Sequence, residues 1–163
     1  MKAVHLTGAR AVGKSAVGWE LFGRALRAGL PVAYLDTAQL GFHADPDHHR
    51  HNVTAVAANH HAAGARWLIL TGPPTPAPPG ATTCHLTATP EVLSTRRLRR
   101  SRGEGPPIPG DDLRGLTAAR LAELPDTIPV DADLTVDTTG LTAVEAADAV
   151  LALLPDWFRA VSR

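Results

Sequence analysis

The residues with the clearest chemical meaning lie near the amino terminus, in one continuous stretch: Gly8, Ala9, Arg10, Ala11, Val12, Gly13, Lys14 and Ser15. The stretch fits the pattern G-x-x-x-x-G-K-[ST] at every position. Glycines let the backbone wrap closely around a phosphate, so that successive N–H groups point inward. The lysine reaches the β- and γ-phosphates, and the serine hydroxyl ligates Mg²⁺. The pattern therefore predicts that residues 8–15 bind a nucleoside triphosphate with Mg²⁺.

A loop of this kind needs a strand before it and a helix after it, and the sequence supplies both. Residues 2–7 are mostly apolar and indicate a buried strand. Residues 15–28 carry apolar side chains along one helical face, and Gly29 ends the pattern. The positive amino-terminal end of such a helix favours bound phosphate.

The rest of the chain alternates the same two signals. Further strands are predicted at 32–35, 67–70, 82–86 and 134–136, and further helices at 52–63, 90–102, 113–124 and 142–154. Short buried strands that alternate with helices indicate an α/β fold, with a five-stranded parallel sheet covered by helices on both faces. The length of 163 residues suits one domain, residues 1–163.

Charge and cysteine content exclude several classes of protein. Lys+Arg and Asp+Glu are balanced at 16 each, so no net field favours nucleic acid or an acidic membrane. The single cysteine, Cys84, excludes a disulfide framework. The amino terminus is too short an apolar run for a signal peptide, and no apolar stretch is long enough to span a membrane. A cytoplasmic protein is therefore expected.

Three features narrow the kind of phosphate-loop protein. The sequence has no N-K-x-D stretch for guanine, and its third strand runs into Thr71 and Gly72 instead of the aspartate-x-x-glycine of signalling GTPases. The chain is too short for the accessory helical domain of a ring-forming ATPase. Asp36 closes the second strand, and the carboxyl ends of the strands face the ligand in such a sheet. We expect Asp36 beside the γ-phosphate; the alternative is a helix N-cap before Thr37.

The chain resembles the small P-loop kinases, among them adenylylsulfate kinase, shikimate and gluconate kinase and chloramphenicol phosphotransferase. The likeness covers nearly the whole chain. It rests on LTGARAVGKS at 6–15, YLD at 34–36, LTATPEVLSTRRLRRSRGEG at 86–105 and ADLTVDTTGLTAVEAADAVLALL at 132–154. The resemblance implies a three-layer P-loop fold with the strand order 2-3-1-4-5.

The same resemblance implies roles for individual residues. An acidic residue after the second strand, here Asp36, orients or deprotonates the acceptor hydroxyl, or holds Mg²⁺ through water. Gly72 matches the place where shikimate-type kinases offer backbone to the acceptor, with a simple turn glycine as the alternative. The loop after the last strand, here containing Thr139, brackets adenine and favours ATP over GTP. A lid with arginines follows the fourth strand, here around 96–112.

Five arginines are concentrated at the start of this lid: Arg96, Arg97, Arg99, Arg100 and Arg102. Guanidinium groups stabilise the charge that phosphoryl transfer spreads over the transferred group. The resemblance implies that the first arginines stack on adenine and that later ones bind phosphate. We therefore expect Arg97 at the adenine, and Arg100 and Arg102 at the phosphates, with Arg100 and Lys14 taking part in catalysis. A solvated basic helix face is the alternative for each arginine.

Residues 41–52 are rich in groups that could bind a metal or a substrate: His43, Asp45, Asp47, His48, His49 and His51. The stretch shows no recognisable spacing of zinc ligands, so a metal site is the less favoured interpretation. It lies where small kinases close over the acceptor, and a histidine such as His43 or His48 could hydrogen-bond that substrate. For Asp47, a helix cap is the alternative.

Two features depart from the resemblance. The third strand lacks the acidic residue of a strong Walker B motif, so Mg²⁺ would depend on Ser15, the phosphates, water and Asp36. The proline-rich loop 73–80 replaces the helix that usually follows this strand.

The sequence predicts a kinase that transfers the γ-phosphate of ATP, with Mg²⁺, to a hydroxyl group of a small molecule. The acceptor and the oligomeric state stay open. The alternative is a non-catalytic or regulatory nucleotide-binding protein. A nucleic-acid kinase is a third class, which the zero net charge disfavours.

Overall fold

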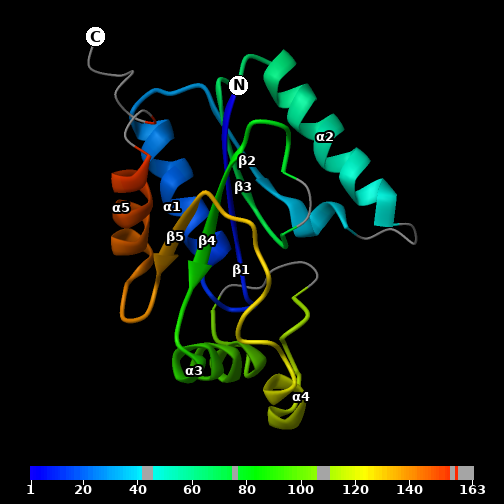
Figure 1. The fold of residues 1–163 in the computed structure, drawn as a ribbon, viewed down its shortest axis with the longest axis vertical. Coiled ribbons are helices and arrows are strands. Elements are labelled where there is room, and N and C mark those ends of the chain that lie inside the picture. The colour runs from blue at the N-terminus through cyan, green and yellow to red at the C-terminus, as the bar shows by residue number, and fades with distance from the viewer. Residues whose placement is uncertain (42–45, 75–76, 106–110, 155–156, 158–163) are drawn as a thin grey trace.

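The computed structural model describes residues 1–41, 46–74, 77–105, 111–154 and 157. Its centre is a five-stranded parallel sheet with the spatial order β2-β3-β1-β4-β5. The strands are β1 (Lys2–Gly8), β2 (Val32–Asp36), β3 (Trp67–Thr71), β4 (Thr82–Thr87) and β5 (Leu134–Asp137). The α/β fold and the strand order implied by the resemblance are confirmed. The carboxyl ends of the strands point downward in Figure 1.

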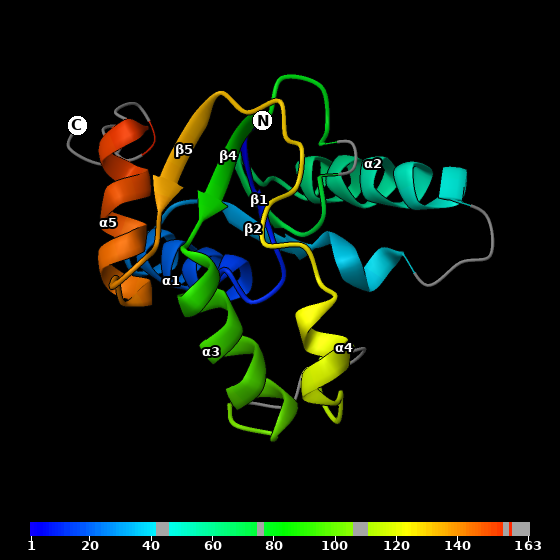
Figure 2. The same ribbon diagram turned by 60° about the horizontal axis from the view of Figure 1, so that its bottom comes forward.

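Helices cover both faces of the sheet. Figure 1 shows α1 (Lys14–Arg27) and α5 (Ala143–Leu153) on one side and α2 (Pro46–Ala62) on the other. Two further helices, α3 (Pro90–Ser101) and α4 (Ala118–Ala122), lie beyond the carboxyl ends of the strands, as Figure 2 shows from below. A short 3-10 helix, η1 (Thr37–Leu40), follows β2 directly. No helix in the described part of the chain is both long and apolar enough to cross a membrane.

Two apolar cores hold the layers together. The larger core joins the sheet to α1 and α5, and its fully buried members include Leu6, Leu21, Ile69, Leu86 and Val150. The smaller core joins the sheet to α2 through residues that include Val53, Leu68 and Leu70. Strand β3 is buried along its whole length, as expected for a parallel strand covered on both faces. Burial of each large apolar side chain contributes about 1.5–3 kcal/mol.

Two predicted helices have different bounds in the structure. Helix α2 begins at Pro46 instead of residue 52, because proline is well suited to the first helical position. The helix predicted at 113–124 is reduced to Ala118–Ala122. Gly115, with φ of 80°, prevents a helix from starting at residue 113. The Thr117 side chain then caps α4 by accepting a hydrogen bond from Arg120 N.

Because α2 begins at Pro46, three of the histidines, His48, His49 and His51, lie on a helix and not on a loop.

A glycine in α1 sets the distance between this helix and the sheet. A Cβ atom at Gly18 would lie 2.4 Å from Thr71 Cγ2 and 3.1 Å from Tyr34 Cε2. The amino-terminal end of α1, which follows the phosphate loop, can therefore approach the ends of β2 and β3 closely.

The Gly18→Ala variant is expected to lower the free energy of unfolding by about 1–3 kcal/mol, since α1 would have to move away from β3. Gly23→Ala is a matched control in the same helix, because its Cβ would meet only the flexible end of Arg27 at 3.2 Å. This control is expected to stabilise the protein by about 0.5–1 kcal/mol. Chemical denaturation of both variants measures the difference, and equal effects would refute the close-packing role of Gly18.

Candidate functional site

The loop between β1 and α1 has the backbone that a phosphate-binding turn requires. Gly8, Ala11 and Gly13 have φ angles of 144°, 68° and 109°. A side chain at Gly8 is excluded, because its Cβ would lie 2.3 Å from the carbonyl oxygen of Leu86 on β4. Ala11 adopts a conformation that costs an alanine about 1–2 kcal/mol. Strained backbone of this kind is concentrated at functional sites.

The Lys14 ammonium group lies inside this loop. Its Nζ donates hydrogen bonds of 2.9 Å to the carbonyl oxygens of both Gly8 and Ala9. Burial lowers the pKa of Lys14 from 10.5 to about 8; the charge of Asp36 opposes this shift, while Arg10 and Arg100 add to it. A partly desolvated ammonium group among other cations is a strong attractor for phosphate.

Asp36 faces the start of α1 from the end of β2. The Ser15 hydroxyl donates a long hydrogen bond of 3.4 Å to Asp36 Oδ2, while Asp36 Oδ1 accepts one of 3.1 Å from Ala38 N. Asp36 is therefore the N-cap of η1, and its second oxygen lies beside Ser15; its place beside a γ-phosphate stays a prediction. Two oxygen donors side by side suit a hard cation such as Mg²⁺.

A tightly packed wall lies next to Asp36. The Thr37 hydroxyl donates to Thr71 O at 3.1 Å, and Tyr34 Oη lies 2.9 Å from Thr71 Oγ1. Gly72 is required here, since its Cβ would lie 1.9 Å from Thr37 Oγ1. Burial raises the pKa of Tyr34, which therefore keeps its proton. Gly72 thus has a packing reason of its own, in addition to the acceptor contact that the resemblance implied.

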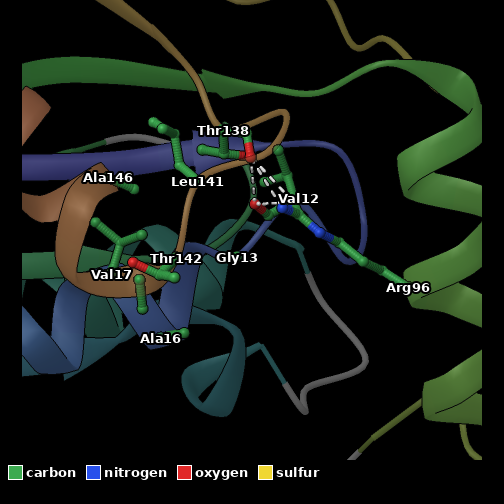
Figure 3. A pocket seen from close by; sticks show the side chains of 10 residues that line it. Val12, Gly13, Ala16, Val17, Arg96, Thr138, Leu141, Thr142 and Ala146 are labelled. Carbon is green, nitrogen blue, oxygen red and sulfur yellow. Dashed lines mark hydrogen bonds between the residues drawn. The ribbon is translucent and has the colours of Figure 1, made fainter.

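A cavity of about 230 Å³ lies on the other side of the phosphate loop. Figure 3 shows it between the start of α1, the loop after β5 and α5, with the side chain of Arg96 entering from α3. Most of its lining is apolar, from Val12, Ala16, Val17, Leu141 and Ala146, and the polar part comes from Arg96, Thr138 and Thr142. The cavity thus combines an apolar lining with three polar side chains.

Arg96, and not Arg97, is the arginine that lines this cavity. The Arg96 guanidinium donates to Val12 O at 3.1 Å and to Thr138 O at 2.9 Å. Arg97 is 2% exposed and donates to Leu124 O, to Pro125 O and to the Asp126 carboxylate. Arg97 therefore has a structural role: it joins α3 to residues 124–126 by hydrogen bonds and an ion pair.

The loop after β5 also borders this cavity. Thr138 lines the cavity, with its hydroxyl oxygen 3.1 Å from Val12 O. Thr139 is not among the lining residues; its side chain accepts a hydrogen bond of 2.9 Å from Thr89 N. The structure thus places Thr138, one residue earlier in the chain, at the cavity, and a contact of Thr139 with adenine stays a prediction.

The other arginines differ in their surroundings. Arg100 Nε lies 3.0 Å and 3.1 Å from the two carboxylate oxygens of Asp111, and Arg100 is one of the charges that act on Lys14. Arg102 is the exposed C-cap residue of α3. Arg100 thus lies within electrostatic range of Lys14, and the phosphate contacts expected of Arg100 and Arg102 stay predictions.

One histidine of α2, His49, contacts this wall. Its Nε2 lies 2.7 Å from Thr37 O, and since a carbonyl oxygen only accepts, Nε2 carries the proton. His48 is exposed on α2. His43 and Asp45, and residues 106–110 of the predicted lid, lie outside the described residues. Within the described ranges, no group of three or more His, Cys, Asp or Glu side chains could hold a metal ion.

The lowered pKa of Lys14 predicts a pH dependence with a definite sign. Between pH 8 and 10.5, Lys14 keeps its proton in the unfolded chain but has lost it in the folded protein. In this range, Lys14 therefore makes the free energy of unfolding of the nucleotide-free protein increase with pH.

The affinity for Mg-ATP is expected to fall as pH rises through about 8, because the ammonium charge is lost. Calorimetry in buffers of different ionisation enthalpy should detect proton uptake on binding near pH 8.5; affinity that stays constant up to pH 10 would contradict this.

Comparison with known proteins shows similarity in structure but not in sequence. No protein-family model and no curated protein matches the chain. The adenylylsulfate (APS) kinase of Mycobacterium tuberculosis, solved with AMPPNP and APS, has 18% identity and a TM-score of 0.61 over 95% of this chain and 98% of its own. Shikimate kinase from Acinetobacter baumannii, solved with shikimate, has 18% identity and a TM-score of 0.52 over 96% and 95%. The chain therefore has the fold of the small P-loop kinases.

Proposed function

We propose that this protein is an ATP-dependent kinase that transfers the γ-phosphate to a hydroxyl group of a small molecule. The observation that carries the proposal is the arrangement around the phosphate loop. Lys14 lies within the loop, the Ser15–Asp36 pair flanks it, and Arg100 acts on the same ammonium group. The kinase fold of the two structural neighbours supports the same class of reaction.

The nucleotide is proposed to lie across the start of α1. Adenine would enter the cavity between the Arg96 side chain and the loop at Thr138, and the phosphates would lie against the amides of residues 8–15. The cavity of about 230 Å³ is smaller than sites that enclose a whole drug-sized ligand, about 300–1,000 Å³, so it suits a single flat ring system. The APS kinase was solved with AMPPNP, which supports a nucleotide on this fold.

The residues around the phosphates fit the chemistry of the transfer. Lys14 and Arg100 would stabilise negative charge on the transferred group. The donor set of Ser15 Oγ and Asp36 Oδ2, which are 3.4 Å apart, fits Mg²⁺ together with phosphate oxygens. When bound, Mg²⁺ would neutralise charge on the phosphates. As the alternative to holding the ion, Asp36 Oδ2 would orient the acceptor hydroxyl or accept its proton.

The acceptor is proposed to approach from the wall of Asp36, Thr37 and Gly72. This side of the phosphate loop is opposite the Arg96 cavity, so the acceptor and the adenine would not compete. The wall offers a carboxylate and a fixed backbone turn, and these groups can recognise hydroxyl groups. Shikimate and APS, the small molecules present in the two neighbours, are consistent with a small polar acceptor.

One observation favours the alternative of a non-catalytic nucleotide-binding protein. Strand β3 ends in Thr71 and Gly72, so the strand next to β1 offers no carboxylate at the phosphate end. A protein that only binds nucleotide would need the loop but not Asp36. The two functions therefore differ in what a change at Asp36 should do.

The Asp36→Asn variant is expected to lose turnover by about a hundredfold or more while its affinity for metal-free ATP changes little. Asparagine caps a helix as well as aspartate does, so η1 is preserved and only the charge is removed. Release of ADP with a panel of hydroxyl compounds measures turnover, and calorimetry measures affinity.

Glu123→Gln provides a control for the change of charge, because Glu123 pairs with Arg120 at the exposed surface of α4. This control should turn over like the unchanged protein. Full turnover in the Asp36 variant would remove this residue from the mechanism. Nucleotide binding without turnover on any acceptor would favour the non-catalytic alternative.

A further inference from the structure

Two consecutive carboxylates are paired with arginines of the phosphate site. Arg10, within the phosphate loop, forms an ion pair with Asp112, in which Arg10 Nη1 lies 2.8 Å from Asp112 Oδ2. Arg100 on α3 contacts both carboxylate oxygens of Asp111 through Nε. Residues 111 and 112 therefore bring two negative charges to the cations of a site that is proposed to bind phosphates.

These contacts belong to one charge cluster centred on Lys14. Arg10 and Arg100 both lower the pKa of this lysine, whereas Asp36 and Asp112 raise it, so all four charges lie within electrostatic range of its ammonium group. Without a ligand, the three cations Lys14, Arg10 and Arg100 are offset by three carboxylates, those of Asp36, Asp111 and Asp112. A polyphosphate brings several more negative charges, which would compete with these carboxylates for the same cations.

We propose that Asp111 and Asp112 set the nucleotide affinity of the site: they hold Arg100 and Arg10 in the nucleotide-free protein and release them to the phosphates on binding. The inference rests on the proposed nucleotide site. Guanidinium binds carboxylate and phosphate with the same donor geometry, so the two anions compete for the same N–H groups. A phosphate that takes these N–H groups would therefore displace an internal anion.

The two carboxylates differ in how tightly they are built into the fold. The Asp111 side chain is only 5% exposed; it also accepts a hydrogen bond from Leu113 N and lies 3.8 Å from Arg114 Nε. Its replacement would disturb the chain after residue 111 as well as the charge. Asp112 and Arg10 are 54% and 51% exposed, so this pair can be broken with little effect on folding. The Asp112 variant is therefore the clean test.

The test is the affinity of the full chain for Mg-ADP and for inorganic tripolyphosphate, measured by calorimetry at low and high salt. Asp112→Asn is expected to bind both probes about two- to fivefold more tightly, as an exposed ion pair is no longer broken. The gain should shrink at high salt. Glu123→Gln removes the same charge from an exposed pair on α4 and should leave both affinities unchanged.

A double-mutant cycle identifies the partner. In an Arg10→Gln background, Asp112→Asn should bring no gain, because the pair no longer exists. Unchanged or weaker binding by Asp112→Asn, or an equal gain without Arg10, would overturn the inference. This test does not measure turnover. If the protein binds both probes but transfers no phosphate, the kinase proposal fails, while the affinities still test the role of Asp112. A chain that binds neither probe would overturn the nucleotide site and this inference together.

Discussion

The site depends on one constraint: the backbone between β1 and α1 must turn back on itself so that its amide groups face a common centre. Gly8 makes this possible by passing against the carbonyl oxygen of Leu86, where no side chain fits. Ala11 and Gly13 take positive φ angles within the same turn. In the structure the Lys14 ammonium group donates to two carbonyl oxygens of the loop, those of Gly8 and Ala9. The loop is thus already formed around a positive charge.

Helix α3 links this loop to the rest of the carboxyl-terminal edge of the sheet. Two adjacent arginines of this helix, Arg96 and Arg97, point in different directions and contact different segments. Arg96 reaches the carbonyl oxygen of Val12 and the loop at Thr138, while Arg97 contacts residues 124–126 and Arg10 O at 3.4 Å. Both therefore contact the phosphate loop through its backbone. Any movement of α3 would change the walls of the cavity and the surroundings of the phosphates at once.

Sequence patterns were sufficient where the determinant is local or topological. Residues 8–15 form their loop because the glycine spacing is local, and Asp36 reaches Ser15 because parallel strands end at one edge. Sequence patterns were insufficient where the direction of a side chain around a helix decides which residue faces the site. Adjacent residues on a helix point about 100° apart, so a run of arginines does not reveal whether Arg96 or Arg97 faces the cavity. The ion pair of Arg10 with Asp112 joins distant segments and has no sequence signature.

The most direct measurement is a crystal structure of the protein with Mg-ADP. The account predicts the β-phosphate among the amides of residues 8–15, with Lys14 Nζ moved from the carbonyl oxygens of Gly8 and Ala9 to phosphate oxygens. It also predicts the adenine beside Arg96 and Thr138. Phosphates bound elsewhere, with Lys14 still donating to its own loop, would contradict it.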